Sequence, residues 1–200
     1  MIREACSCST SPEIDLAKIV NFDSFRAYRW LVSIAEPNHK LHDYLRHNGV
    51  DINHIINLLE GAIALCEWTI HGGPKEDCIA IPVMDEDGIT PLDVVMFSMR
   101  DPGRFGTMLG LGAVLGAGEV MNPGTYWDGD PCRLLRTPLD WVREGIEGCA
   151  VILNAERAKS MIAWAPGALA ARDEAHADEL VDMGIVDPKR LVVPVLGRAA

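Results

Sequence analysis

Apolar residues recur at steps of three and four positions in the first third of the chain. The clearest series follows Asp51 and comprises Ile52, Ile55, Ile56, Leu59, Ile63, Cys66 and Ile70. Because such spacing lines one face of an α-helix with apolar side chains, it predicts a helix from Asp51 to His71, ended by a Gly-Gly-Pro sequence. Weaker series with suitable capping residues predict three shorter helices before it, over residues 13–20, 23–36 and 38–47.

The pattern changes after Pro74, where short β-type runs replace the helical spacing. Residues 78–84 and 92–97 flank an acidic turn and predict a hairpin with a longer loop. Residues 134–153 predict a strand, a helix capped by Thr137 and a second strand, while residues 166–183 and 191–196 predict a final helix and strand. We therefore expect an α+β protein in which a helical N-terminal layer packs on a small mixed β-sheet. Residues 1–73 would be the helical subregion and residues 74–200 the α/β subregion of one compact unit.

Composition narrows the classes of partner. The 200 residues are 48% hydrophobic, which is ample for a packed core, and their 29 acidic and 18 basic side chains give a net charge of −11. This charge disfavours attraction to phosphate backbones, so nucleic acid is not expected as a direct ligand. The acidic residues either only keep the protein soluble or form an acidic face for a protein partner with a basic surface.

Signals for export or membrane insertion do not occur in the sequence. Residues 1–8 lack the apolar core of a signal peptide, and the weakly polar run over residues 107–118 is too short to span a bilayer. The six cysteines are then expected to be free thiols in a reducing compartment. These features predict a cytoplasmic protein without membrane contact, and its apolar and aromatic content allows a homodimer.

Carboxylates gather in two turn sequences. Asp85, Glu86 and Asp87 lie close together before Asp93, and Asp128 and Asp130 flank a glycine further along the chain. If the two turns met, Asp85, Asp87, Asp128 and Asp130 could hold magnesium and assist hydrolysis of a phosphodiester. Acidic residues before glycine are also common in ordinary turns, which is the structural alternative.

Two aromatic residues adjoin the second acidic turn. Tyr126 and Trp127 follow an Asn-Pro-Gly sequence that predicts an exposed loop. Aromatic rings beside acids are typical of binding surfaces, so a surface of Glu86, Asp87, Tyr126, Trp127, Asp128 and Asp130 is a candidate. The alternative is that the rings fold back onto the core.

Other chemistry-bearing residues give weaker signals. His39 and His42 would share a helix face, but no second close pair of cysteine or histidine residues completes a zinc pattern. Cys66 and His71 could pair as nucleophile and base, yet no third group orients the histidine. The glycines of residues 110–118 lack the spacing of a nucleotide loop, so they favour close backbone packing, with small-molecule binding as an alternative. No cofactor is expected.

One segment resembles other proteins. Residues 136–153, together with the upstream segment 116–119, are similar to a pattern in uncharacterised proteins of proteobacterial prophages and mobile elements. The resemblance covers about residues 89–154 and transfers no catalytic residue. It implies an accessory protein of a phage or plasmid that binds a host or phage protein.

These observations favour a non-enzymatic acidic interaction module of a phage or mobile element. Its function would be to bind a protein with a basic surface, for example as an inhibitor of a host nucleic-acid-binding machine. The alternative is a carboxylate and metal dependent hydrolase or nuclease that uses Asp85, Asp87, Asp128 and Asp130.

Overall fold

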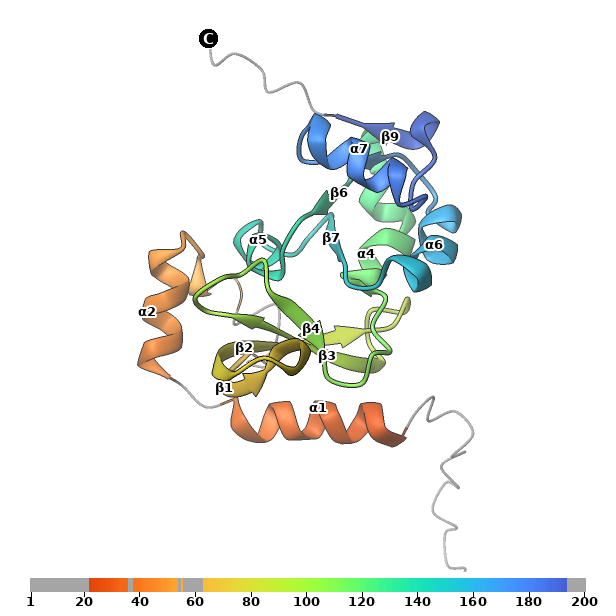
Figure 1. Ribbon diagram of the computed structural model, residues 1–200. Coiled ribbons are helices and arrows are strands. Elements are labelled where there is room, and N and C mark those ends of the chain that lie inside the picture. Colours follow the sequence, from red (N-terminus) through yellow and green to blue (C-terminus); the bar gives the residue numbers. More distant parts are fainter. Residues whose placement is uncertain (1–21, 36–37, 54, 56–62, 194–200) are drawn as a thin grey trace, which may run out of the picture.

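The computed structural model describes residues 22–35, 38–53, 55 and 63–193, and contains two β-sheets (Figure 1). The first sheet is antiparallel with strand order β1-β2-β3-β4. Its strands are β1 (Ala64–Thr69), β2 (Lys75–Met84), β3 (Pro91–Ser98) and β4 (Phe105–Thr107). β2 and β3 form the hairpin that the β-type runs predict, with Ile79 opposite Phe97 and Ile81 opposite Val95.

The second sheet is mostly parallel and has strand order β5-β7-β6-β8-β9. Its strands are β5 (Val114–Leu115), β6 (Cys132–Leu135), β7 (Cys149–Ile152), β8 (Leu169–Ala170) and β9 (Leu191–Val192). Only β5 is antiparallel to its neighbour. The helices of this half are α4 (Ala117–Met121), α5 (Pro138–Arg143), α6 (Ala155–Trp164) and α7 (Glu174–Asp182), with 3-10 turns η3 (Pro123–Gly129) and η4 (Pro188–Arg190).

Side chains that alternate along the parallel strands point to opposite faces of the sheet and belong to two separate hydrophobic cores. Leu134 and Ala150 pack with α4, α6 and α7, whereas Leu135 and Val151 pack with α5 and the antiparallel sheet. This second core also takes in Ile81 of β2, so it joins the two sheets. Because side chains alternate along a strand, each central strand is buried on both faces.

Helices α1 (Phe22–Ile34) and α2 (His39–His47) belong to the antiparallel half. Leu31 of α1 is fully buried against Ala80 and Met96, on the face of β2 and β3 that points away from the parallel sheet. Asn38 caps α2 by accepting hydrogen bonds from the first-turn amides. None of the helices in these described ranges is long and apolar enough to cross a membrane.

The α+β class with an N-terminal helical part is confirmed, and the helices predicted over 23–36 and 38–47 match α1 and α2. The long helix from Asp51 to His71 is wrong in its second half, because residues 64–69 are strand β1. There, Ala64 and Cys66 pair across the sheet with Ala80 and Cys78 and face α1. Burial on a sheet thus overrode the helical spacing. The boundary between residues 73 and 74 falls between β1 and β2, and residues 13–20 lie outside the described residues.

The end of the chain also differs from expectation. The helix predicted over residues 166–183 is wrong in its first half: helix α6 ends at Trp164, strand β8 follows, and α7 covers only Glu174–Asp182. β8 has only two residues, both buried, which is too short to leave a period-2 pattern in the sequence. This strand completes the parallel sheet and creates the edge described below.

Candidate functional site

The parallel sheet has a topological switch point between β6 and β8. These two strands are neighbours, but β6 leads through α5 to β7 on one side, whereas β8 leads through α7 to β9 on the other. In open α/β sheets, the loops that leave such strands in opposite directions open a crevice at the carboxyl edge, where ligands bind. Here the two loops supply Arg136 directly after β6, and Arg172 and Asp173 shortly after β8.

Arg136 links the loop after β6 to the segment after β8. Its Nη1 lies 2.7 Å from Oε2 of Glu179, and its Nη2 lies 3.2 Å from Oδ1 of Asp173. Asp173 is also the N-cap of α7 and accepts a hydrogen bond of 2.8 Å from the amide of His176. The hydrogen bond from the His176 amide lowers the pKa of Asp173 most, and the hydrogen bond and charge of Arg136 lower it further. The guanidinium therefore lies beside an ionised carboxylate at the start of a helix.

Asp140 holds two further arginines at the same edge. Its Oδ1 lies 2.9 Å from Nη1 of Arg143 and 3.0 Å from Nη1 of Arg172, while its Oδ2 accepts a hydrogen bond of 2.9 Å from Thr137. The Asp140 side chain is only 12% exposed, whereas Arg143 and Arg172 reach solvent. Together these groups form what we call the switch-point cluster: Arg136, Asp140, Arg143, Arg172, Asp173, His176 and Glu179.

His176 is the buried member of the switch-point cluster, with 5% of its surface exposed. Its Nδ1 accepts a hydrogen bond of 3.3 Å from the amide of Arg172, which fixes the tautomer with the proton on Nε2 when the ring is neutral. Burial, reinforced by the charge of Arg136, lowers the pKa of His176 below its ordinary value of 6.5. The ring is therefore neutral near pH 7, and it ties the loop after β8 to α7.

This lowered pKa predicts an acid-sensitive contribution to stability. As the pH falls from about 7.5 to about 5.5, the unfolded chain binds a proton at His176 before the folded chain does, so the free energy of unfolding falls. One histidine contributes a slope of at most about 1.4 kcal/mol per pH unit. The His176→Asn variant keeps an acceptor for the Arg172 amide but does not titrate. Urea unfolding at several pH values should show a shallower pH dependence for this variant, and equal slopes in the two proteins would contradict the assignment.

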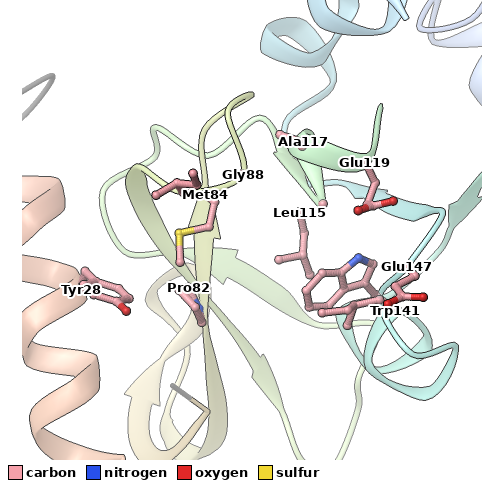
Figure 2. Close-up of a pocket in the computed structure, with 13 residues that line it drawn as sticks. Tyr28, Pro82, Met84, Gly88, Leu115, Ala117, Glu119, Trp141 and Glu147 are labelled. Atoms are coloured by element: carbon pink, nitrogen blue, oxygen red, sulfur yellow. The ribbon is translucent and has the colours of Figure 1, made fainter. Parts of the chain in front are cut away.

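A hollow lies where the two sheets meet (Figure 2). It is a cleft of about 550 Å³, lined by the tip of the β2–β3 hairpin, the start of α4 and the end of α5. Trp141 forms its inner wall and donates a hydrogen bond of 3.1 Å from Nε1 to the carbonyl of Cys149. Glu119 accepts hydrogen bonds from the amide of Gly148 and the hydroxyl of Thr125, at 2.8 and 2.9 Å. These hydrogen bonds therefore hold the Trp141 ring and the Glu119 carboxylate in place at the cleft.

The glycine-rich segment over residues 110–118 serves close packing. A β-carbon on Gly112 would lie 3.2 Å from Val83, and one on Gly116 would lie 2.5 Å from the carbonyl oxygen of Cys149. The same segment is tied down by Asp93, which is buried and accepts backbone hydrogen bonds from Leu109, Leu111 and Gly112. The carboxylate of Asp93 is therefore structural, and the glycines allow the chain to lie against it.

The first acidic turn is built by its own hydrogen bonds. Asp87 accepts hydrogen bonds from the Thr90 hydroxyl and from the amides of Ile89 and Thr90, and these lower its pKa, the hydroxyl contributing most. Asp85 accepts a hydrogen bond of 2.8 Å from the amide of Glu86. Glu86 and Asp87 border a shallow pocket with Glu119, and neither Asp128 nor Asp130 lines it.

The second acidic turn divides its predicted binding residues between surface and interior. Trp127, Asp128 and Asp130 are exposed in and after η3, and Asp128 has a positive φ of 64°. Tyr126 folds inward instead. Its hydroxyl donates a hydrogen bond of 2.7 Å to the carbonyl of Val120, and its ring packs so closely on Gly167 that a β-carbon there would lie 2.2 Å from it. The structure therefore supports the inward alternative for Tyr126 and the exposed one for Trp127.

Side chains that could ligate a metal ion do not lie close together in the described parts of the chain. His39 and His42 lie on α2, and within residues 22–35, 38–53, 55 and 63–193 no three His, Cys, Asp or Glu side chains are grouped so as to hold a metal ion. Cys66 lies on β1, and burial raises the pKa of its thiol to about 12, so it is a thiol rather than a nucleophilic thiolate near pH 7.

The arginines of the switch-point cluster are the functional candidates that the sequence did not reveal. Arg136 directly follows an apolar strand, which was a usable signal. Arg172, and Asp173 as an ion-pair partner of Arg136, fell inside the helix predicted over residues 166–183, so the junction between β8 and α7 was not recognised.

Comparison with known proteins identifies a fold. No family model matches the sequence, and no curated protein matches it. The structure is similar to the crystal structure of the zinc-binding and RNA polymerase domains of the Aquifex aeolicus primase, with a TM-score of 0.62 and 11% sequence identity. The similarity covers 94% of this chain and 57% of the primase chain.

This similarity corrects the predicted function. The chain shares its fold with the zinc-binding and RNA polymerase domains of a primase, which contradicts its description as an acidic interaction module and phage accessory inhibitor. The alternative hydrolase or nuclease is not supported either, because in the part of the chain that the structure describes Asp85 and Asp87 do not form a metal-type group with Asp128 and Asp130. The resemblance over residues 89–154, the basic protein partner and the homodimer stay predictions. From this comparison we conclude only that the chain has a fold similar to that of the zinc-binding and RNA polymerase domains of a primase.

Proposed function

We propose that this chain is a nucleotide-binding domain of a nucleic-acid-handling protein, and that it binds a nucleotide phosphate at the carboxyl edge of its parallel sheet. The observation that carries the proposal is the position of Arg136, Arg143 and Arg172 at the switch point of a fold shared with a primase. Such edges bind ligands in open α/β sheets, and the guanidinium group matches phosphate geometry.

The hydrogen-bonding capacity of these arginines supports phosphate binding. A guanidinium has five N–H donors, and Arg172 gives one of its side-chain nitrogens to Asp140 while half of its side chain is exposed. Arg136 is 35% exposed and also has donors left after its two ion pairs. Asp140 orients Arg143 and Arg172 without consuming all their donors. The N-terminus of α7 adds a favourable dipole at the same edge.

The ion pairs of the switch-point cluster contribute little to the free energy of folding. Pairs between partly exposed side chains contribute between zero and about 1 kcal/mol each, so they are a weak source of folding energy. Their effect on orientation is larger, because each guanidinium is held by a carboxylate at a defined distance. This pre-organisation lowers the entropy lost when an anion binds.

The net charge limits the size of the ligand. With a charge of −11, the chain repels a long phosphate backbone, and the expectation that extended nucleic acid is not bound directly remains compatible with the proposal. Local recognition of one or two phosphates needs only a short-range site. We therefore expect a mononucleotide or a short single strand to bind better than a duplex.

The proposal predicts a loss of binding in the Arg136→Gln variant. Calorimetric titration with adenosine 5′-monophosphate should give an affinity at least about tenfold weaker than that of the unchanged protein, because a charge-assisted hydrogen bond is lost. The affinity should also depend less on salt. Arg157→Gln, an equal charge change on the exposed surface of α6, is the matched control and should bind like the unchanged protein.

Three further ligands sharpen this test. Adenosine without phosphate should bind much more weakly, inorganic phosphate measures the anion alone, and a short single-stranded oligonucleotide measures recognition within a strand. Circular dichroism confirms that Arg136→Gln is folded, which we expect because Asp173 and Glu179 are half exposed. Equal affinities for adenosine and adenosine 5′-monophosphate, or equal losses in Arg136→Gln and Arg157→Gln, would refute the proposed site.

A further inference from the structure

The cleft between the sheets, shown in Figure 2, has two unlike sides. One side is apolar and comes from α1 and the β2–β3 hairpin, with Tyr28, Pro82 and Met84. The opposite side carries Trp141 together with the carboxylates of Glu119 and Glu147. Ligand sites of this size typically combine an apolar lining with a few placed polar groups.

Neither carboxylate has a cationic partner within the described part of the chain. Glu147 is exposed, and its side chain forms no ion pair there. Glu119 uses one oxygen to accept from Gly148 and Thr125, which are uncharged donors. The nearby guanidinium of Arg133 pairs with Glu144 and reaches only the backbone carbonyl of Glu147. The cleft therefore has two negative charges that the protein itself does not neutralise by pairing.

The backbone beside Trp141 holds this side of the cleft in an unusual shape. Ile146 has a positive φ of 61°, in the left-handed region that β-branched residues rarely occupy, and follows Gly145 at 81°. The amide of Ile146 donates to the carbonyl of Trp141 at 3.2 Å, and that of Glu147 donates to the carbonyl of Gly145 at 2.8 Å. This tight turn places Ile146 and Glu147 at the cleft directly after α5 ends.

We propose that the cleft binds a small organic cation that carries an ammonium group on an apolar stem. The stem would lie against Pro82, Met84 and Leu115, and the ammonium group would lie between Glu119 and Glu147, beside the indole of Trp141. The carboxylates supply charge-assisted acceptors, and the aromatic ring supplies a cation–π contact. Burial of the stem supplies the apolar part of the affinity.

This site is independent of the proposed nucleotide site. Glu147 and the start of β7 lie at the amino edge of the parallel strands, whereas Arg136 and Arg172 lie at the carboxyl edge. The ligand classes are also opposite in charge. A failure at one site therefore leaves the other unaffected.

The test uses n-hexylammonium as the probe and follows the indole Nε1–H signal of Trp141 by NMR. We expect that signal to shift saturably with n-hexylammonium and much more weakly with 1-hexanol, which has the same stem without the charge. In Glu147→Gln the affinity should fall about tenfold. Glu119→Gln, which keeps an acceptor for the Gly148 amide, is a second variant with the same expectation.

Glu174→Gln is the matched control, because it removes one exposed negative charge from α7, outside the cleft. Its affinity for n-hexylammonium should equal that of the unchanged protein. Three outcomes would overturn the proposal: no shift of the Trp141 signal, equal binding of 1-hexanol and n-hexylammonium, or equal loss in Glu147→Gln and Glu174→Gln.

Discussion

Replacing Asp93 with alanine is expected to lower the free energy of unfolding by at least about 4 kcal/mol. The carboxylate is 1% exposed and accepts four backbone hydrogen bonds of 2.7 to 2.9 Å, from Val94, Leu109, Leu111 and Gly112. Removing it leaves four backbone donors without this acceptor, and a buried donor without a partner costs about 1–3 kcal/mol. Urea unfolding followed by circular dichroism measures the loss.

Asp85→Ala is the matched control for this substitution. Asp85 lies at the start of the β2–β3 turn, is partly exposed and accepts one hydrogen bond from the adjacent amide of Glu86. Its removal should cost no more than about 1 kcal/mol. If Asp93→Ala were as stable as Asp85→Ala, the carboxylate of Asp93 would not be the anchor of the glycine-rich segment.

The second large effect is expected for Gly116→Ala, with a loss of about 3 kcal/mol or more in the free energy of unfolding. Gly116 has a positive φ of 80°, and a β-carbon there would lie 2.5 Å from the Cys149 carbonyl oxygen and 2.8 Å from Nε1 of Trp141. The added methyl group must therefore displace the hydrogen bond between these two groups. The fluorescence and the indole NMR signal of Trp141 should change together with the stability.

Gly184→Ala separates the two causes. Gly184 also has a positive φ, of 64°, but nothing lies within 4 Å of its added β-carbon. It should show only the conformational cost, about 1–2 kcal/mol. A loss in Gly116→Ala no larger than that in Gly184→Ala would show that the close contact with β7 is unimportant for stability.

The sequence was informative where one local signal determined one element. Thr137 before Pro138 predicted the start of α5, and its hydroxyl does accept from the amide of Asp140 at 3.1 Å. The β2–β3 hairpin was likewise readable from two β-type runs around an acidic turn. In both cases the determining contacts are within a few residues or between adjacent strands.

The sequence misled where distant contacts decided the structure. β1 has helical spacing but is a strand because β2 offers it a partner, and two-residue β8 exists because β6 and β9 flank it. The switch-point cluster depends on that short strand, since the two ion pairs of Arg136 join residues 37 and 43 positions apart. Net charge could not reveal this cluster either, because it sums over the whole chain and does not show that Arg136, Arg143 and Arg172 lie at one edge.

Fold similarity adds what neither charge nor motif could supply. At 11% identity no residue of the primase can be transferred to this chain, so the proposed site rests on its own geometry. In the described residues, Asp140, Asp173 and Glu179 each pair with an arginine at the carboxyl edge. These pairs hold the guanidinium groups of Arg136, Arg143 and Arg172 in place, and this geometry is the basis of the proposed phosphate site.

The most direct test of the account is an NMR titration of the uniformly labelled protein with adenosine 5′-monophosphate. Saturable shifts are expected for the backbone amides that follow β6 and β8, including Arg136, Arg172 and Asp173, and for the Arg136 side chain. Adenosine alone should leave these signals nearly unchanged. Shifts confined to other surfaces, or no shifts at this edge when the phosphate is present, would contradict the central claim that the carboxyl edge of the parallel sheet binds a nucleotide phosphate.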